Sequence, residues 1–191
     1  MARERKFTTE EVFETTKQLL LDYGYEGFTF SLLANHLKVS RGAIYKYFEN
    51  KEELISEYII YQMKVFLSQL ERINTYTTFD EQFEYLMDII LNDYELHRIR
   101  RIAIDIPASD NAKEKENKKQ LDNLHLDMYT TLQQFIKLGR EEKRLNPRIP
   151  DSLILGFIFQ TVDIPNHYNV PREDWIKSMK EIIMNGISNS N

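Results

Sequence analysis

A run of basic and hydroxyl side chains, interrupted by two small residues, lies between residues 38 and 51. It contains Lys38, Ser40, Arg41, Gly42, Ala43, Tyr45, Lys46, Tyr47 and Lys51. Ammonium, guanidinium and hydroxyl groups all donate hydrogen bonds to phosphate oxygens, and a guanidinium can also bind a guanine edge through two parallel bonds. The chemistry that this run predicts is therefore non-covalent recognition of a nucleic acid.

The remainder of the chain offers little for catalysis. It has 0 Cys, which excludes thiolate nucleophiles, thiolate metal sites and disulfides. The four His residues, at positions 36, 97, 125 and 167, have no local spacing typical of metal ligands. Phosphate-binding Gly-x-x-x-x-Gly-Lys, nucleophile-elbow Gly-x-Ser-x-Gly and zinc-binding His-Glu-x-x-His motifs are missing from the sequence. We therefore predict that the protein is not an enzyme and uses no metal or cofactor.

Two short helices are predicted to position the basic run. Thr29 can cap a helix that carries Leu33 and Leu37, and Ser40 can cap another in which Ile44 and Phe48 stand four residues apart. Two short helices joined by a tight turn form a helix-turn-helix pattern. Ile44 and Phe48 define the buried face of the second helix.

The opposite face of this second helix is suited to a DNA major groove. Gly42 and Ala43 stand at its centre, so the helix can approach base edges closely. Arg41, at the helix N-terminus, is predicted to contact bases. Contacts to phosphates are assigned to Tyr45, Lys46 and Tyr47. Lys51 begins the next helix, where backbone N–H groups also favour a phosphate. The alternative is that these are ordinary surface residues of a small helical bundle.

The segment resembles the DNA-binding segment of TetR-type bacterial transcriptional repressors. The matching residues are Leu33-Ala34, Val39-Ser40, Gly42-Ala43, Tyr45-Lys46-Tyr47-Phe48 and Lys51-Glu52-Glu53-Leu54. The likeness covers about the first quarter of the chain. The family usually has Gly before Val-Ser, where this sequence has Lys38. A left-handed conformation at a non-Gly residue costs about 1 kcal/mol, but Lys38 also places a cation near the DNA edge.

The resemblance implies a homodimer that binds a palindromic operator, with its two modules about one helical turn apart. It also implies repression of transcription, which ends when a small-molecule ligand shifts the fourth helix and releases the DNA. The alternative is an interaction module of the same fold that binds DNA or a protein partner without an inducer. The expected location is the cytoplasm, with no membrane association.

The whole chain of 191 residues is predicted to be all-α, with about nine helices. We expect a three-helix DNA-binding domain over residues 1–50 and a larger ligand-binding and dimerisation domain over residues 51–191. Helices are expected from Leu96 to Ile106 and, as one continuous element, from Leu121 to Leu138. The first 51 residues hold eight basic and seven acidic residues, whereas the remainder holds 17 and 23. This balance argues against a general polyanion binder.

Two apolar helices near the C-terminus are predicted to form the dimer. Residues 153–162 are apolar nearly all round, and a narrow apolar seam follows from Trp175 to Ile187. Two such helices from each chain would make a four-helix bundle. The predicted interface residues are Leu153, Gly156, Phe157, Trp175, Met179, Ile182 and Ile183. The alternative is that both helices belong to the core of one chain.

The sequence specifies the identity of the ligand less clearly than any other feature. Aromatic side chains are frequent after residue 79, and polar residues interrupt their helical stripes. The candidate pocket residues are Tyr94, His97, Asp105, His125, Tyr129, Gln133 and Phe159. The basic run from His97 to Arg101 suits an anionic group such as the phosphates of an acyl-coenzyme A, or is a solvated face. Aromatic rings with acidic residues would instead suit a lipophilic cation. Both possibilities stay open.

Overall fold

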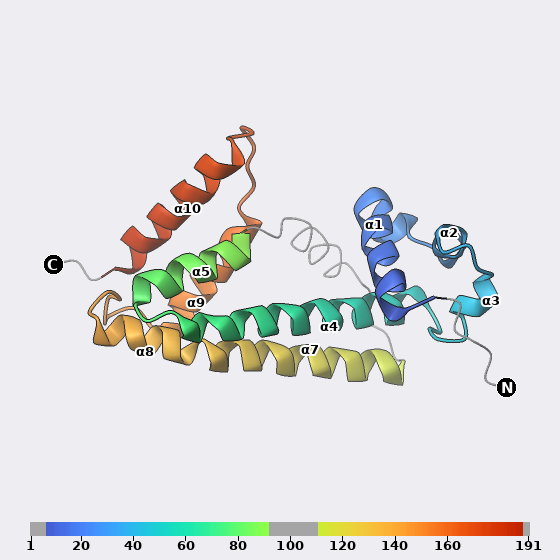
Figure 1. Ribbon diagram of the computed structural model, residues 1–191, viewed down its shortest axis with the longest axis horizontal. Helices are drawn as coiled ribbons and strands as arrows, with labels where there is room; N and C mark the ends of the chain where they lie inside the picture. The colour runs from blue at the N-terminus through green and yellow to red at the C-terminus, as the bar shows by residue number, and fades with distance from the viewer. Residues whose placement is uncertain (1–6, 92–110, 189–191) are drawn as a thin grey trace. The chain divides into compact units, whose positions relative to one another are not determined.

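The structure is a computed structural model that describes residues 7–91 and 111–188 (Figure 1). Within these ranges the regular elements are helices, and the β pairing is limited to one isolated bridge between Leu145 and Ser188. The predicted all-α class is confirmed. The helix expected from Leu96 to Ile106 lies outside the described residues.

Four helices begin the described chain. They are α1 (Thr9–Gly27), α2 (Phe30–His36), α3 (Arg41–Ile44) and α4 (Lys51–Leu70). The first begins with a complete capping box, in which the Thr8 hydroxyl accepts from the Glu11 N–H at 3.1 Å and the Glu11 carboxylate accepts from the Thr8 N–H at 2.7 Å. Gly24 kinks α1 with a φ of 66°, a conformation that glycine adopts without strain.

Packing divides the described chain into two compact units. The first takes in the residues up to Lys64 together with residues 111–123, and the second takes in residues 65–91 and 124–188. The first turns of α4 therefore pack with the helices that precede them. The apolar core of the first unit includes Leu19, Leu33, Ile44 and Leu54, all with 0% of their surface exposed.

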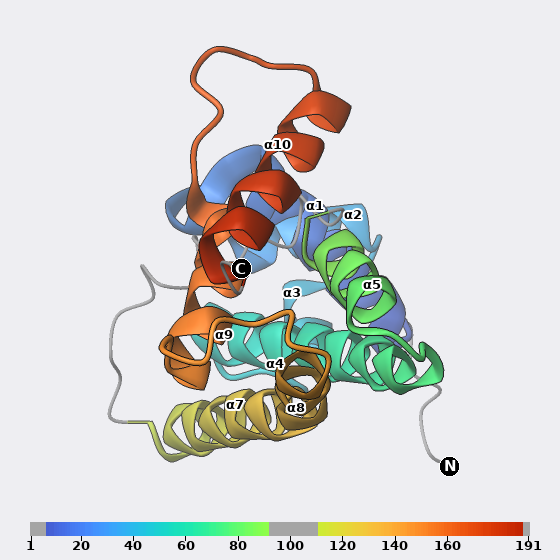
Figure 2. The same ribbon diagram turned by 90° about the vertical axis from the view of Figure 1, so that its left-hand side faces the viewer.

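The second unit is built around α5. Its elements are the end of α4, η1 (Glu71–Thr75), α5 (Phe79–Leu91), the end of α7 (Ala112–Thr131), α8 (Gln133–Glu141), α9 (Asp151–Gln160), η2 (Thr161–Asp163) and α10 (Arg172–Ile187). Within this unit α5 contacts both α8 and α10, and the three helices can be followed in Figures 1 and 2. Phe79 of α5 stacks on Phe135 of α8, with ring centroids 4.9 Å apart. The predicted continuous helix from Leu121 to Leu138 is interrupted by a turn at Leu132, which separates α7 from α8.

The described helices bear on two kinds of functional feature, membrane spans and metal sites. None of them is both long and apolar enough to cross a membrane. In the same ranges, no group of three or more His, Asp or Glu residues is placed to hold a metal ion.

Candidate nucleic-acid interface

One surface of the first unit combines exposed donors with a firmly buried inner face. Ile44 and Phe48 are 0% and 4% exposed, whereas Tyr45 and Tyr47 are 49% and 43% exposed. The exposed set also includes Arg41, Gly42 and Lys46. We call residues 41–48 the recognition segment. Its buried and exposed faces agree with the sequence analysis.

The recognition segment is less helical than predicted. Regular helix ends at Ile44, and turns carry the chain on to Phe48. The N–H groups of Tyr45 and Phe48 still bond to carbonyls four residues earlier, at 3.1 Å each, while the N–H of Tyr47 bonds to Ile44 O at 2.9 Å. This shorter i→i+3 bond tightens the turn. The prediction of one helix from Arg41 to Phe48 was therefore wrong in extent.

Buried phenylalanines hold the two exposed tyrosines. Phe30 meets the Tyr45 ring edge-on at 5.0 Å between centroids, and Phe7 meets Tyr47 in the same way at 5.4 Å. The Tyr45 hydroxyl lies 3.5 Å from Nη2 of Arg41, whose guanidinium carbon is 5.8 Å from the Tyr45 ring centroid. These contacts order the donors before a partner arrives, which reduces the entropy lost on binding.

The turn between α2 and α3 has the left-handed residue that the sequence implied. Lys38 has a φ of 54°. The N–H of Val39 closes the turn by bonding to Ala34 O at 2.9 Å. Thr29 caps α2, as predicted, by accepting from Leu32 N at 3.2 Å. Ser40 occupies the N-cap position of α3, as predicted, but its side chain makes no capping bond to that helix.

Lys51 has partners within the first unit. Its Nζ donates to the Tyr25 carbonyl at 3.0 Å and lies 3.9 Å from the Tyr25 ring centroid. The Tyr25 hydroxyl donates to the Glu52 carboxylate. Burial, followed by the bond to Glu52, raises the pKa of Tyr25 well above its ordinary value. A phosphate contact by Lys51 would thus require it to exchange the Tyr25 carbonyl for a phosphate oxygen.

The candidate pocket residues are only partly brought together. Tyr129 of α7 and Phe159 of α9 meet edge-on, with centroids 6.4 Å apart, and Phe66 of α4 meets Phe159 at the same distance. The sequence analysis did not single out Phe66. His125 and Gln133 are exposed. Tyr94, His97 and Asp105 lie outside the described residues.

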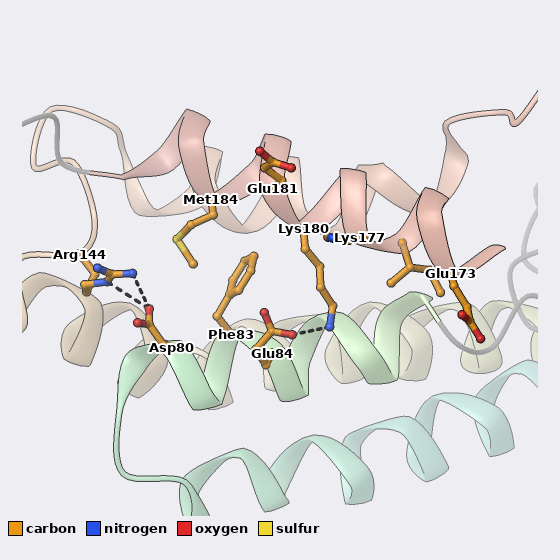
Figure 3. A pocket seen from close by; sticks show the side chains of 10 residues that line it. Asp80, Phe83, Glu84, Arg144, Glu173, Lys177, Lys180, Glu181 and Met184 are labelled. Carbon is orange, nitrogen blue, oxygen red and sulfur yellow. Dashed lines mark hydrogen bonds and ion pairs between the residues drawn. The ribbon is translucent and has the colours of Figure 1, made fainter. Parts of the chain in front are cut away.

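A groove between α5 and α10 was not predicted (Figure 3). Its volume is about 700 Å³. It is lined by Asp80, Phe83, Glu84, Arg144, Glu173, Ile176, Lys177, Lys180, Glu181 and Met184. None of the predicted pocket residues is among them. The two helices that form it, α5 and α10, are about 80 to 100 residues apart in the sequence, and no local residue spacing predicts that they pack together.

Ion pairs cross this groove. Lys180 Nζ lies 2.5 Å from Glu84 Oε2 and 2.8 Å from Asp88 Oδ1, and Arg144 bonds Asp80 at 2.8 Å. Burial tends to lower the pKa of Lys180, but its bonds to Asp88 and Glu84 outweigh burial and raise it. The groove is therefore bridged by paired charges.

The predicted dimer residues fall into three groups by exposure: exposed, buried and partly buried. Leu153, Phe157 and Ile182 are 60%, 42% and 61% exposed, which is unusual for large apolar side chains. Met179 and Ile183 are 4% and 0% exposed, so they belong to the core of the second unit. Trp175 is half-buried, and a Cβ added to Gly156 would meet nothing within 4 Å.

The geometry defines a class of protein: an all-helical protein whose N-terminal unit contains a helix-turn-helix with exposed hydrogen-bond donors. Residues 12–58 match the family model for "Bacterial regulatory proteins, tetR family". This match identifies residues 12–58 as a TetR-type DNA-binding segment, so the predicted resemblance is confirmed for this part of the chain. No curated protein matches the chain at a significant level.

Solved structures share the fold over nearly the whole chain. The transcriptional regulator FadR of Bacillus subtilis, in complex with stearoyl-CoA, has a TM-score of 0.71 and 19% identity, over 94% of this chain and 100% of that one. The fatty acid degradation regulator FadR of Bacillus halodurans has a TM-score of 0.73 and 16% identity, over 100% of both. PfmR, a TetR family regulator of Thermus thermophilus, has a TM-score of 0.74 and 18% identity, over 96% and 99%.

Proposed function

We propose that this DNA-binding regulator is a repressor that binds a palindromic operator as a homodimer and releases it when a small molecule binds the second unit. The observation that carries the DNA-binding part is the recognition segment. Its exposed Arg, Lys and Tyr side chains surround small residues, while Ile44 and Phe48 fix the segment to the core. This arrangement matches the way in which helix-turn-helix proteins read a major groove.

Roles within the recognition segment are assigned by chemistry. Arg41 stands at the start of α3 and reads bases, while Lys46 and the hydroxyls of Tyr45 and Tyr47 bind phosphates. We expect Arg41→Ala to weaken operator binding by about 1–3 kcal/mol and to relax specificity at one position of each half-site. Lys46→Ala, its matched control, should weaken binding to all sequences alike and lower the salt slope by about 1. Titrations against operator and random DNA at several salt concentrations measure both effects. Equal losses on both DNAs for Arg41→Ala would reject its role.

The operator is found by selecting fragments of the source genome with the purified protein at near-physiological salt, where non-specific binding is weak. We expect enrichment of one or a few fragments that contain an inverted repeat. A transcription assay with such a fragment then separates repression from activation. If no fragment is enriched by folded protein, in samples with and without bound small molecules, the DNA-binding proposal fails.

Exposed apolar residues on α9 and α10 support the homodimer. Leu153, Phe157 and Ile182 are 42–61% exposed, and covering them in a symmetric interface would remove apolar surface from water. A two-fold arrangement would also place two recognition segments on one inverted repeat.

The effector that we propose to test first is a long-chain acyl-coenzyme A. The support is the likeness in fold to a regulator solved with stearoyl-CoA, together with the basic run from His97 to Arg101 and the aromatic contacts of Phe159. We expect stearoyl-CoA to dissociate the operator complex and to raise thermal stability, by about 2.7 kcal/mol at 100 times its dissociation constant. Coenzyme A and stearate alone are the controls. A protein that binds its operator but responds to no metabolite would favour regulation without an inducer.

A further inference from the structure

The residues just before α4 and α7 bond both to their own helix and to the start of the other, either within that helix or just before it. Asn50 lies just before α4, and its Oδ1 accepts from the Glu53 N–H at 2.7 Å, which caps that helix. The amide nitrogen of the same side chain donates to Glu114 Oε1 of α7 at 2.9 Å. One side chain therefore both starts α4 and ties it to α7.

Asn111 makes the reciprocal arrangement just before α7. Its Oδ1 accepts from the Lys113 N–H at 2.8 Å, and its Nδ2 donates to Glu49 Oε2 at 3.0 Å. A third bond follows one turn later, where Asn117 donates to Ser56 Oγ of α4 at 2.8 Å. Asn117 is only 2% exposed, so this bond is shielded from water. We refer to these three cross-helix bonds as the crossed caps.

Two of the crossed caps are made by the residues that directly follow the recognition segment. Glu49 and Asn50 follow Phe48, the buried last residue of that segment. Within the first unit, the first turns of α7 lie beside those of α4 (Figure 1). A change in these bonds would therefore move the point at which the recognition segment joins α4.

We propose that the first turns of α7 hold the recognition segment in its DNA-binding position, with Asn50 and Asn111 as the positioning residues. The bonds of Asn50 and Asn111 are polar and reach solvent, so water can replace each of them at little net cost, unlike the buried bond of Asn117 and the apolar contacts of the surrounding core. A held and a released arrangement can thus lie close in free energy, and DNA selects the held one. This inference rests on the proposed binding of operator DNA.

A charge-swapped pair tests the cross-helix bond without removing the cap. Asn111→Asp keeps an oxygen for the Lys113 N–H, because Asp and Asn cap helices about equally well. It replaces the amide donor with a second carboxylate facing Glu49. We expect operator affinity to fall on the order of tenfold, the equivalent of about 1.4 kcal/mol. Adding Glu49→Gln restores a bond of reversed polarity, and affinity should return to within about threefold of wild type.

The matched control has the same net charge but lacks the restored bond. Glu10 is exposed on the first turn of α1, so Asn111→Asp with Glu10→Gln equals the rescued variant in charge. This control should stay as weak as Asn111→Asp alone. Thermal unfolding confirms that each variant is folded. If Asn111→Asp is not, Asn50→Asp with and without Glu114→Gln provides the same test on the other bond.

Hydrogen exchange measures directly whether operator binding and the crossed caps are coupled. Linkage requires that operator DNA stabilise the crossed caps if the crossed caps favour DNA binding. In wild type, operator should therefore slow amide exchange over residues 113–117, and in Asn111→Asp it should do so less. Wild-type affinity in Asn111→Asp, or equal rescue by Glu10→Gln and Glu49→Gln, overturns the proposal. Failure of wild type to bind any DNA would count against the proposed function instead.

Discussion

Lys38 is a residue whose backbone conformation and charge can be separated by experiment. Its φ of 54° is strained for any side chain with a Cβ. We predict that Lys38→Gly stabilises the protein by about 0.5–1 kcal/mol, since relief of about 1–2 kcal/mol of backbone strain exceeds the roughly 0.5–1 kcal/mol that the added chain entropy of glycine costs. Lys38→Ala, the control, keeps the Cβ and should gain nothing. Denaturant unfolding measures both; equal stabilities of the two variants would mean that the turn is unstrained.

The same pair of variants tests the cation at position 38. If Lys38 contacts the DNA edge, Ala and Gly should weaken operator binding equally, because both remove the ammonium group. A loss in Gly alone would point to the turn geometry instead.

Glu57 is predicted to make stability depend on pH. Burial, the largest influence, and nearby Glu53 raise its pKa in the folded state, although Lys113 at 4.0 Å opposes them. A carboxyl group whose folded pKa is raised contributes stability below its unfolded pKa and loses it as the pH rises through the folded pKa. We therefore expect Glu57→Gln to raise Tm at pH 7 and to change it little near pH 4, which thermal unfolding at the two pH values measures.

The control for Glu57 is Glu116→Gln. Glu116 approaches the same Lys113, at 3.7 Å, but is exposed. Its substitution removes the same charge without relieving burial, so Tm at pH 7 should not rise. A similar gain from both variants would mean that net charge, and not burial, is responsible.

At the scale of elements, the contact of α8 with α5 depends on one glycine. A Cβ at Gly139 would stand 2.6 Å from a Phe79 ring carbon and 2.7 Å from Leu145. We predict that Gly139→Ala costs about 1–3 kcal/mol, because the stacked Phe79 ring must move. Gly186→Ala in α10 meets nothing within 4 Å and should stabilise by up to about 1 kcal/mol. Urea titrations compare them, and a stabilised Gly139→Ala would show that the ring moves freely.

The elements that could be predicted from the sequence are those specified by neighbouring residues. Thr8 with Glu11 caps α1, and Thr78 with Glu81 caps α5 through bonds of 3.0 and 3.3 Å; both pairs have the Thr-x-x-Glu spacing of a capping box, which can be read from the sequence. The buried face of the recognition segment could be predicted from apolar spacing, because Ile44 and Phe48 share one face, whereas its assignment to DNA rested on its donor residues and on the family resemblance. Ser40 looked like a cap from its residue type, but whether its hydroxyl bonds to α3 is a matter of side-chain orientation.

Contacts between distant helices could not be predicted in this way. Lys180 bonds to Glu84 and Asp88, which lie 96 and 92 residues earlier in the sequence, and Asn111 bonds to Glu49, which lies 62 residues earlier. Nothing in the local pattern of α10 or α7 distinguishes these residues from an ordinary solvated face. The candidate pocket was inferred from residue type alone; among its described members, Tyr129 and Phe159 meet edge-on, whereas His125 and Gln133 are exposed.

At the scale of the whole molecule, the exposed apolar residues of α9 provide the test of the dimer. We predict that Leu153→Asp with Phe157→Asp yields a folded monomer that has lost high-affinity operator binding, since two carboxylates would be buried in the interface. Leu126→Asp on α7, with a parent side chain that is 65% exposed, is the control and should remain dimeric. Light scattering measures the mass. A dimer that survives the double substitution places the interface elsewhere.

The substitution Gly156→Ala tests whether α9 lies in a dimer interface, because its effect on Tm should differ in sign between an interface and an exposed surface. Within one chain a methyl group at Gly156 meets nothing within 4 Å, so Gly156→Ala should strengthen α9 by up to about 1 kcal/mol. In a symmetric interface the same methyl group would enter a close contact between two copies and weaken dimerisation. Because dimer stability depends on concentration, Tm should rise relative to wild type in dilute samples and fall in concentrated ones. A rise at every concentration would mean that Gly156 is not at the interface.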